Sequence, residues 1–168
     1  MKRSLMIFCC AVATAAAHAA ETAPNPLVDY AKFQQIVSTS MLDHESHRLT
    51  ESEFLARMRQ PDVIVLDART DSRYRLRHIK GAVSLPFTEF TEATLAAVVP
   101  RKDATILIYC NNNFLDSPAA FASKAPAASL NLSTYTSLRA YGYTNVYELG
   151  PLLHVGSTKI PFSGSEVD

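Results

Sequence analysis

Two runs of nearly uninterrupted apolar residues stand out along the chain. One covers residues 63–66 and the other covers 104–109. Runs of this length without polar alternation are typical of strands in a parallel sheet that is covered on both faces. Two shorter candidates, over 82–85 and 145–149, are each followed by a proline or a glycine that would end a strand. The pattern therefore predicts a sheet of several short, buried strands.

Helical spacing of apolar residues occurs between and around these strands. The stretches near 71–77, 91–99, 118–124 and 132–141 have this spacing, as do residues 27–37 earlier in the chain. Thr50 and Glu53 have the spacing of a capping box, which predicts the start of a further helix that Pro61 ends. Strands that alternate with helices predict an α/β fold with helices on both faces of the sheet.

The composition fits one globular domain. The chain has 168 residues, 48% of them apolar, and its 16 basic and 16 acidic residues give a formal net charge of zero. A chain of this size buries enough surface for a single core without disulfides or metals. The absence of a basic excess argues against a nucleic-acid partner, and the basic residues between 73 and 80 are interpreted as a charged helix face.

The N-terminus has the pattern of a secretory signal peptide. A short basic start is followed by an apolar run over 5–17 and by the small-x-small sequence at 17–19. The run is shorter than the roughly 20 apolar residues that a membrane-spanning helix needs. We therefore expect residues 1–19 to be cleaved, and the mature protein to be periplasmic or secreted and free of the membrane.

Removal of this signal would leave one cysteine. Cys9 and Cys10 lie within residues 1–19, so Cys110 would have no intramolecular partner. An exported protein usually pairs its thiols or lacks them, so a single remaining thiol suggests a function. The alternative is a buried cysteine that serves packing.

Cys110 directly follows a predicted buried strand, and ligands of open parallel sheets bind at the carboxyl ends of strands. Asn111, Asn112 and Asn113 come next, and asparagine tolerates the left-handed backbone angles of tight loops. We expect a loop whose backbone N–H groups surround the sulfur and stabilise its thiolate. This expectation requires a sulfur that is open to solvent.

Four segments, in this order, resemble the rhodanese-like domain family. Family members combine an apolar strand ending in Asp-x-Arg, a Gly-His-Ile-x-Gly-Ala segment, a strand ending in the active cysteine, and a closing Gly-aromatic-x-Asn-Val strand. The matching segments here are VIVLDAR at 63–69, RHIKGA at 77–82, LIYC at 107–110 and YGYTNVYEL at 141–149.

The resemblance implies a mainly parallel five-stranded sheet with helices on both faces. It predicts a rhodanese-like domain at 50–156, after a lead-in and helix at 20–49 and before a polar tail at 157–168, which we interpret as a surface extension. It also implies that Cys110 takes sulfane sulfur as a persulfide and passes it to a nucleophile. The donor would be a small sulfur-containing anion such as thiosulfate, the acceptor would be a thiol or a cyanide-like nucleophile, and no metal or cofactor would be needed.

The resemblance also suggests roles for the residues near Cys110. The expected contacts to the donor are Asn111, Asn112, Asn113, Phe114, Leu115 and Arg69. Arg69 could brace the loop by pairing with Asp67, or could also attract the donor anion, and bracing is favoured. Asp67 and His78 are expected to support the structure, His78 within a turn.

The loop after Cys110 departs from the family in its charge. Active rhodaneses commonly carry basic residues there, whereas the sequence of residues 111–116 provides amides and no cation. Phosphatases and arsenate reductases of the same fold have an arginine six residues after the cysteine. Here that position is Asp116, which would repel an oxyanion, so phosphoryl and arsenate chemistry are disfavoured.

An insertion follows this loop, at residues 114–130, where the family usually passes directly into one helix. It could be a lid or a surface for a protein partner. Three hypotheses stay open. The protein is a sulfurtransferase, a catalytically silent binding module that docks a protein on the insertion, or a thiol redox sensor that acts through Cys110.

Potential metal ligands cluster over residues 43–47, which read Asp-His-Glu-Ser-His. Their spacing is not that of the HExxH zinc helix. We interpret the cluster as a solvated surface loop and predict no metal site there.

Overall fold

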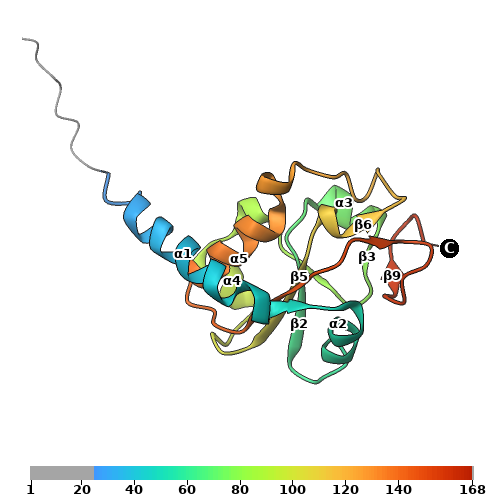
Figure 1. The fold of residues 1–168 in the computed structure, drawn as a ribbon, viewed down its shortest axis with the longest axis horizontal. Coiled ribbons are helices and arrows are strands. Elements are labelled where there is room, and N and C mark those ends of the chain that lie inside the picture. Colours follow the sequence, from blue (N-terminus) through green and yellow to red (C-terminus); the bar gives the residue numbers. More distant parts are fainter. Residues whose placement is uncertain (1–24, 168) are drawn as a thin grey trace, which may run out of the picture.

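The computed structural model describes residues 25–167 of the chain (Figure 1). The predicted signal, residues 1–19, lies outside the described residues. In the described part of the chain, no helix has the length and the apolar character needed to cross a lipid bilayer.

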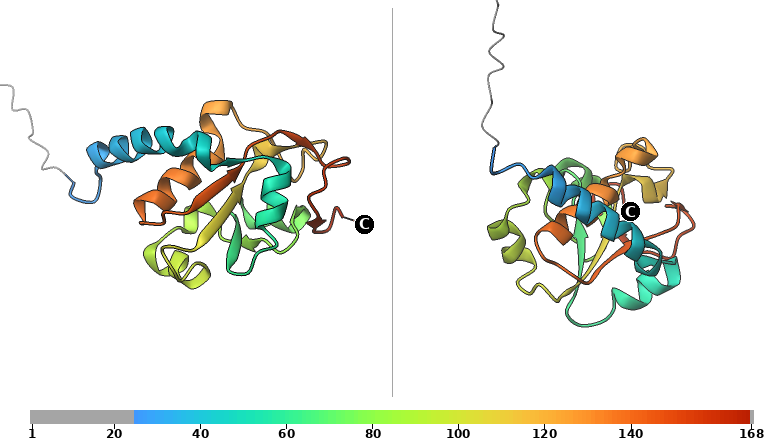
Figure 2. Two further views of the ribbon diagram at one scale, coloured as in Figure 1. Left: turned by 60° about the horizontal axis from the view of Figure 1, so that its bottom comes forward. Right: turned by 60° about the vertical axis from the view of Figure 1, so that its left-hand side comes forward.

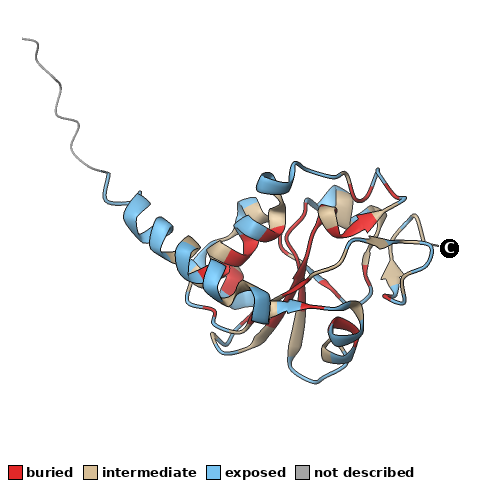
Figure 3. Cartoon of the chain, in the orientation of Figure 1, coloured by how far each residue is buried: buried red, intermediate tan, exposed pale blue. Residues whose placement is uncertain are grey.

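A five-stranded parallel sheet forms the centre of the molecule. Its order is β1 (Arg48–Leu49), β7 (Val146–Leu149), β5 (Thr105–Tyr109), β2 (Val63–Asp67) and β4 (Val83–Ser84). The apolar runs predicted β2, β4, β5 and β7 but not β1, and the parallel five-stranded sheet that the family resemblance implied is confirmed. Figure 3 shows the central strands as the most buried part of the molecule, because β5 has a neighbour on each side and helices above and below.

Helices cover both faces of the sheet, as predicted. On one face, α2 (Glu51–Arg57) packs against the sheet through Phe54. On the opposite face lie α4 (Glu92–Val98) and α5 (Leu130–Ala140), and Leu138 of α5 belongs to that face's core. The two core clusters therefore lie on either side of the sheet, and the carboxyl ends of the strands lie between them.

Local sequence explains where the short helices begin. The carboxylate of Glu53 accepts a hydrogen bond from Thr50 N at 2.8 Å, and Thr50 Oγ1 accepts one from Glu53 N, which completes the capping box of α2. Thr91 and Thr94 form a similar box at the start of α4. The predicted helix near 71–77 is α3 (Asp71–Leu76).

The helix α1 (Tyr30–His47) is longer than its apolar spacing predicted. Asp29 caps its N-terminus, and the helix continues through residues 43–47, so the interpretation of that cluster as a loop is wrong. The first half of α1 projects beyond the sheet, whereas its second half lies along α5 (Figures 1 and 2).

Specific contacts, rather than apolar spacing, hold the C-terminal end of α1. His44 Nε2 lies 2.7 Å from Glu148 Oε1, and the ring of His47 stacks on Tyr147 with centroids 4.8 Å apart. These polar residues looked like a loop because their partners are distant in sequence. Across residues 25–167, no group of three or more His, Cys, Asp or Glu side chains is placed to hold a metal ion.

The insertion lacks its predicted helix. Residues 118–124 form a turn followed by irregular chain. Arg69 Nη1 donates to Ala120 O at 2.9 Å, and Asn111 Nδ2 donates to Ala122 O at 2.7 Å. Because side chains from other segments bind these carbonyls, the backbone satisfies its hydrogen bonds without forming a helix.

The C-terminal residues 157–167 are not the surface extension that their polar composition predicted. The strand β9 (Phe162–Ser163) pairs antiparallel with β3 (His78–Ile79), and Ile160 is buried. The carboxylate of Glu51 also accepts a hydrogen bond from the tail's backbone at 2.6 Å. The tail thus closes one side of the core.

The remaining elements are short. They are the strands β6 (Phe114–Leu115) and β8 (Leu153–His154), which pair in parallel, and the 3₁₀ turns η1 (Phe87–Glu89), η2 (Asn111–Asn113) and η3 (Pro126–Ala128).

Candidate functional site

Cys110 follows β5 directly, at the carboxyl end of the central strand. Its Sγ lies 3.4 Å from Ser129 Oγ and accepts a hydrogen bond from Asn112 N, also at 3.4 Å. The residue is 1% exposed. The expectation of an openly exposed sulfur is therefore wrong, because the turn η2 and Ser129 cover it.

The cysteine nevertheless lies at the wall of a pocket. Cys110 lines a pocket of about 240 Å³, together with polar side chains that include Arg48, Ser129, Asn131 and Glu148. This volume accommodates a small anion. Any reagent that meets the sulfur must therefore approach it through a polar pocket.

The backbone of η2 does not form the expected ring of donors. Asn113 N donates to Cys110 O, and Asn113 Oδ1 accepts from Cys110 N at 2.8 Å. Asn112 N donates to Sγ, and the side chain of Cys110 also caps the backbone of Asn113. Because the side chain of Asn113 folds back onto Cys110 N, the two residues cap the turn reciprocally.

The three asparagine side chains serve as braces. Asn111 and Asn112 bind the backbone of residues 122–124, with Asn112 Oδ1 accepting from Lys124 N at 2.8 Å. Asn113 Nδ2 donates to the last carbonyl of β7 at 2.7 Å. Asn112 and Asn113 line the pocket, whereas Asn111 faces the insertion.

Two other predicted contacts lie away from the pocket. Phe114 is fully buried among Tyr109, Phe121 and Phe162. Leu115 lies in β6 and pairs with β8. The predicted role of both residues in donor binding is therefore wrong, since the chain after η2 turns into the core instead of following the pocket.

Arg69 is locked inside the protein and is 2% exposed. Its Nε donates to Asp67 Oδ1 at 2.9 Å, and its guanidinium also donates to the carbonyls of Arg77 and Ala120. Burial alone would lower the pKa of Arg69, but hydrogen bonding to Asp67 raises it above its ordinary value. With its donors engaged in this way, Arg69 braces the loop and does not reach an anion in the pocket.

Tyr109, the last residue of β5, completes this buried network. Its hydroxyl donates to Asp67 Oδ2 at 2.5 Å and accepts from Ile79 N at 3.1 Å. Burial and the negative charge of Asp67 raise the pKa of Tyr109 well above its usual value, so the hydroxyl keeps its proton and its role as a donor. Asp67 therefore ties the ends of two central strands together.

His78 lies in the turn motif where the sequence analysis expected it. Its Nδ1 lies 2.7 Å from Tyr74 O, and its ring stacks on that of Tyr74 with centroids 3.8 Å apart. It pairs through β3 with the tail strand β9. His78 thus contacts structural elements and is remote from the pocket at Cys110.

The charged groups of the pocket come from outside the cysteine loop. Arg48 lies at the start of β1, with its Nε 3.4 Å from Glu148 Oε1, and His44 reaches the same carboxylate oxygen from α1. Glu148 is 6% exposed, so its carboxylate holds both side chains at the pocket wall. Arg48 supplies the positive charge that the loop after Cys110 lacks.

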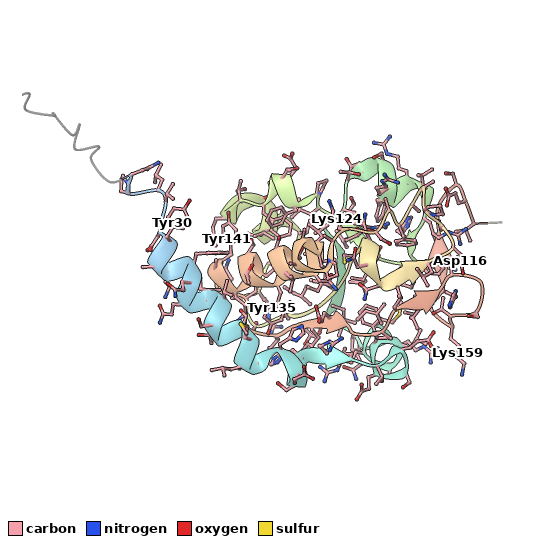
Figure 4. All side chains as sticks on the ribbon, turned by 45° about the horizontal axis from the view of Figure 1, so that its top comes forward. Tyr30, Asp116, Lys124, Tyr135, Tyr141 and Lys159 are labelled. Carbon is pink, nitrogen blue, oxygen red and sulfur yellow. The ribbon has the colours of Figure 1, made fainter. Side chains whose placement is uncertain are left out.

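Asp116 takes no part in the pocket. It has a positive φ of 69°, and its carboxylate lies 2.7 Å from His154 Nδ1 on the surface. Figure 4 shows Asp116 at the opposite end of the molecule from Tyr30, the first residue of α1. Asp116 therefore lies on the surface and does not line the pocket of Cys110.

A family model for the rhodanese-like domain matches residues 50–150, which is more than half of the chain. The chain belongs to the rhodanese-like domain family. The matched region begins after α1 and β1, so His44 and Arg48 both precede it.

The chain is also similar to individual proteins. It is 27% identical over 95 residues to the thiosulfate sulfurtransferase PspE of Escherichia coli, which covers 56% of this chain and 76% of that protein. Its fold is similar to that of the BH2092 protein from Bacillus halodurans, with a TM-score of 0.52, 19% identity, and coverage of 80% of this chain and 90% of that one. The Alr3790 protein from Anabaena gives a TM-score of 0.50 and 21% identity, over 69% of this chain and 80% of that one. The two structures share the fold, whereas the family match and the similarity to PspE support a sulfurtransferase-like role.

Sequence reasoning missed His44, Arg48, Ser129, Asn131 and Glu148 as pocket residues. One signal was present, because a glutamate inside the apolar closing strand at 145–149 requires a partner if that strand is buried. The partners themselves could not be found, because they lie about a hundred residues away in sequence, before the family's signature begins.

Proposed function

We propose that this rhodanese-like domain is an exported sulfurtransferase that carries sulfane sulfur as a persulfide on Cys110. The single observation that carries the proposal is the position of the sulfur. It lies at the carboxyl end of the central strand and borders a polar pocket that contains a cation. Family membership and the similarity to a thiosulfate sulfurtransferase support the same chemistry.

In the first step, the thiolate of Cys110 attacks the outer sulfur of a small anion such as thiosulfate. A bond forms between the cysteine sulfur and that outer sulfur, and the sulfur–sulfur bond of the donor breaks. Sulfite leaves with the electron pair, and Cys110 retains a persulfide anion. The charges balance, and no oxidant, metal or cofactor enters the step.

Arg48 attracts the donor anion, a role that basic residues of the cysteine loop have in other members of the family. Its guanidinium lies in the pocket wall and is half-exposed, so it can reach both solvent and a bound anion. Ser129 and Asn112 contact the sulfur itself, and their O–H and N–H groups can stabilise negative charge on Cys110 or on its persulfide.

In the second step, a nucleophile such as a thiolate or cyanide attacks the outer sulfur of the persulfide. The bond to the cysteine sulfur breaks, its electron pair returns to Cys110, and the thiolate is regenerated. Export through the segment at 1–19 is part of this proposal, because it removes Cys9 and Cys10 and leaves Cys110 to react without an intramolecular partner.

The test is the intact mass of the protein purified without residues 1–19, after incubation with thiosulfate. We expect one added sulfur atom, absent from Cys110→Ser. The burial of Cys110 also favours a second candidate, a catalytically silent binding module. An unchanged mass with several sulfane donors would overturn the sulfurtransferase and favour that module, and a mixed disulfide would favour a redox sensor.

A further inference from the structure

A second and larger cavity adjoins the pocket of Cys110. It has a volume of about 790 Å³ and lies between α1 and α5. Its lining is mainly apolar and includes Phe33, Val37 and Met41 on α1. The volume is within the range of small-molecule binding sites. We call this cavity the α1–α5 groove.

The groove and the cysteine pocket are adjacent. His44, Asn131, Leu132 and Glu148 line both of them. A molecule that extends across this shared wall would have one end beside Cys110 and the other between the two helices. The two compartments differ in chemistry, because the groove is largely apolar and the pocket holds Cys110 and Arg48.

The wall of the groove contains buried polar oxygens. In residues 25–167, Ser40 Oγ, Tyr135 Oη and Asn131 Oδ1 have no hydrogen-bond partner, and all three residues are more than nine-tenths buried. Figure 4 shows Tyr135 between α5 and α1. Buried polar atoms are normally satisfied, so unsatisfied ones along a cavity indicate a site that a ligand or water completes.

We propose that the α1–α5 groove binds the apolar body of the sulfur acceptor, a small amphipathic thiol whose sulfur reaches Cys110 at the junction beside His44. The inference rests on the proposed function and specifies its acceptor. A free peptide helix is a poorer occupant, since the adjacent pocket at Cys110 has a volume of only about 240 Å³, which admits the head of a small molecule.

The transfer needs no further reagent. The acceptor thiol releases its proton to solvent, and the thiolate attacks the outer sulfur of the Cys110 persulfide. The new sulfur–sulfur bond belongs to the acceptor, and the electron pair of the broken bond returns to Cys110. The apolar body raises the rate by holding the acceptor next to the persulfide.

The first measurement is the loss of the persulfide from thiosulfate-loaded protein, followed by intact mass. Benzyl mercaptan and 2-mercaptoethanol serve as acceptors, each calibrated by its rate with a low-molecular-weight persulfide in solution. We expect benzyl mercaptan to react at least about tenfold faster than 2-mercaptoethanol after this calibration, because its ring leaves water for the groove.

Matched variants assign this preference to the groove. Phe33→Glu combined with Met41→Glu changes two exposed groove residues of α1, and Tyr30→Glu combined with Leu42→Glu changes two exposed residues of the same helix outside the groove. The first pair should abolish the preference, and the second should keep it. Persulfide formation with thiosulfate should be the same in both, since none of the four positions lines the cysteine pocket.

A binding measurement separates this inference from the proposed function. We expect the fluorescence of anilinonaphthalene sulfonate to rise when the dye is mixed with the Cys110→Ser protein, and to fall again when benzyl mercaptan is added as a competitor. With a Cys110→Ser protein that also carries Phe33→Glu and Met41→Glu, the fluorescence should stay low. If the persulfide forms but reacts with both thiols at equal calibrated rates, the groove assignment alone is overturned. If Phe33→Glu combined with Met41→Glu instead changes the sedimentation coefficient of the protein, the groove is occupied by a second copy of the chain, and the groove assignment is also overturned. Failure to form any persulfide would overturn the proposed function itself.

Discussion

Two polar clusters lie at the carboxyl edge of the same sheet, and they differ in how completely they are satisfied. The first joins Asp67, Arg69 and Tyr109 at the ends of β2 and β5, where each polar group has a buried partner. The second surrounds Cys110, where Arg48 is half-exposed and the buried Asn131 Oδ1 has no partner within the described residues. The first cluster stabilises the fold, and the second leaves groups available for a ligand.

The largest expected effect is on the first cluster. Asp67→Asn would leave the buried guanidinium of Arg69 without its counter-charge, so we expect the free energy of unfolding to fall by about 3–5 kcal/mol. Urea denaturation measures this change. Asp103→Asn is the matched control, because Asp103 pairs with Arg101 on the surface, where solvent screens the pair, and the free energy of unfolding should fall far less than in Asp67→Asn. Equal costs would remove the distinction between a structural cluster and an ordinary ion pair.

The next effect concerns the second cluster. Arg48→Met removes the positive charge of the cysteine pocket and keeps an unbranched side chain. We expect the second-order rate of persulfide formation with thiosulfate to fall by about five- to tenfold, and its dependence on ionic strength to weaken. The exposed Arg59 lies outside this pocket, so Arg59→Met should change neither quantity. An unchanged rate in Arg48→Met would show that the donor is attracted by some other group.

The smallest expected effect is on a contact that belongs to neither cluster, the one between α2 and the C-terminal tail. A hydrogen bond from Thr158, and further ones from the tail backbone, lower the pKa of Glu51 below the ordinary value of 4.5. As the pH falls, Glu51 therefore takes up a proton in the unfolded chain before it does so in the folded protein. The contribution of its ionised carboxylate to stability is complete above pH 4.5 and is lost as the pH falls through the folded-state pKa.

Thermal unfolding at several pH values measures this contribution. Glu51→Gln should lower the midpoint slightly at pH 7 and flatten its decline in acid, with no change in persulfide formation. A steeper acid decline in the variant would contradict the assigned direction of the pKa shift.

The sequence patterns were sufficient for four of the five strands of the sheet, all but β1, and for the position of Cys110. Continuous apolar runs such as 63–66 have few alternatives to a buried strand, and the residue after such a strand must lie at the sheet's edge. The capping box of Thr50 and Glu53 was also predictable, because both partners lie within one turn. These features depend on residues that are close to one another in the sequence.

The features that escaped prediction depend on contacts between distant residues. The end of α1 at 43–47 forms because His44 and His47 find partners on β7, and 118–124 stays irregular because Arg69 and asparagine side chains bind its carbonyls. Phe114 looked available to a donor because nothing local reveals that the chain folds it into the core.

The most direct test of the central claim is the release of sulfite when the protein, at high concentration and without an acceptor, is mixed with thiosulfate. The account predicts a burst of one sulfite for each Cys110, with no burst from Cys110→Ser and a slower burst of full size from Arg48→Met. A wild-type signal that does not exceed that of Cys110→Ser would contradict it.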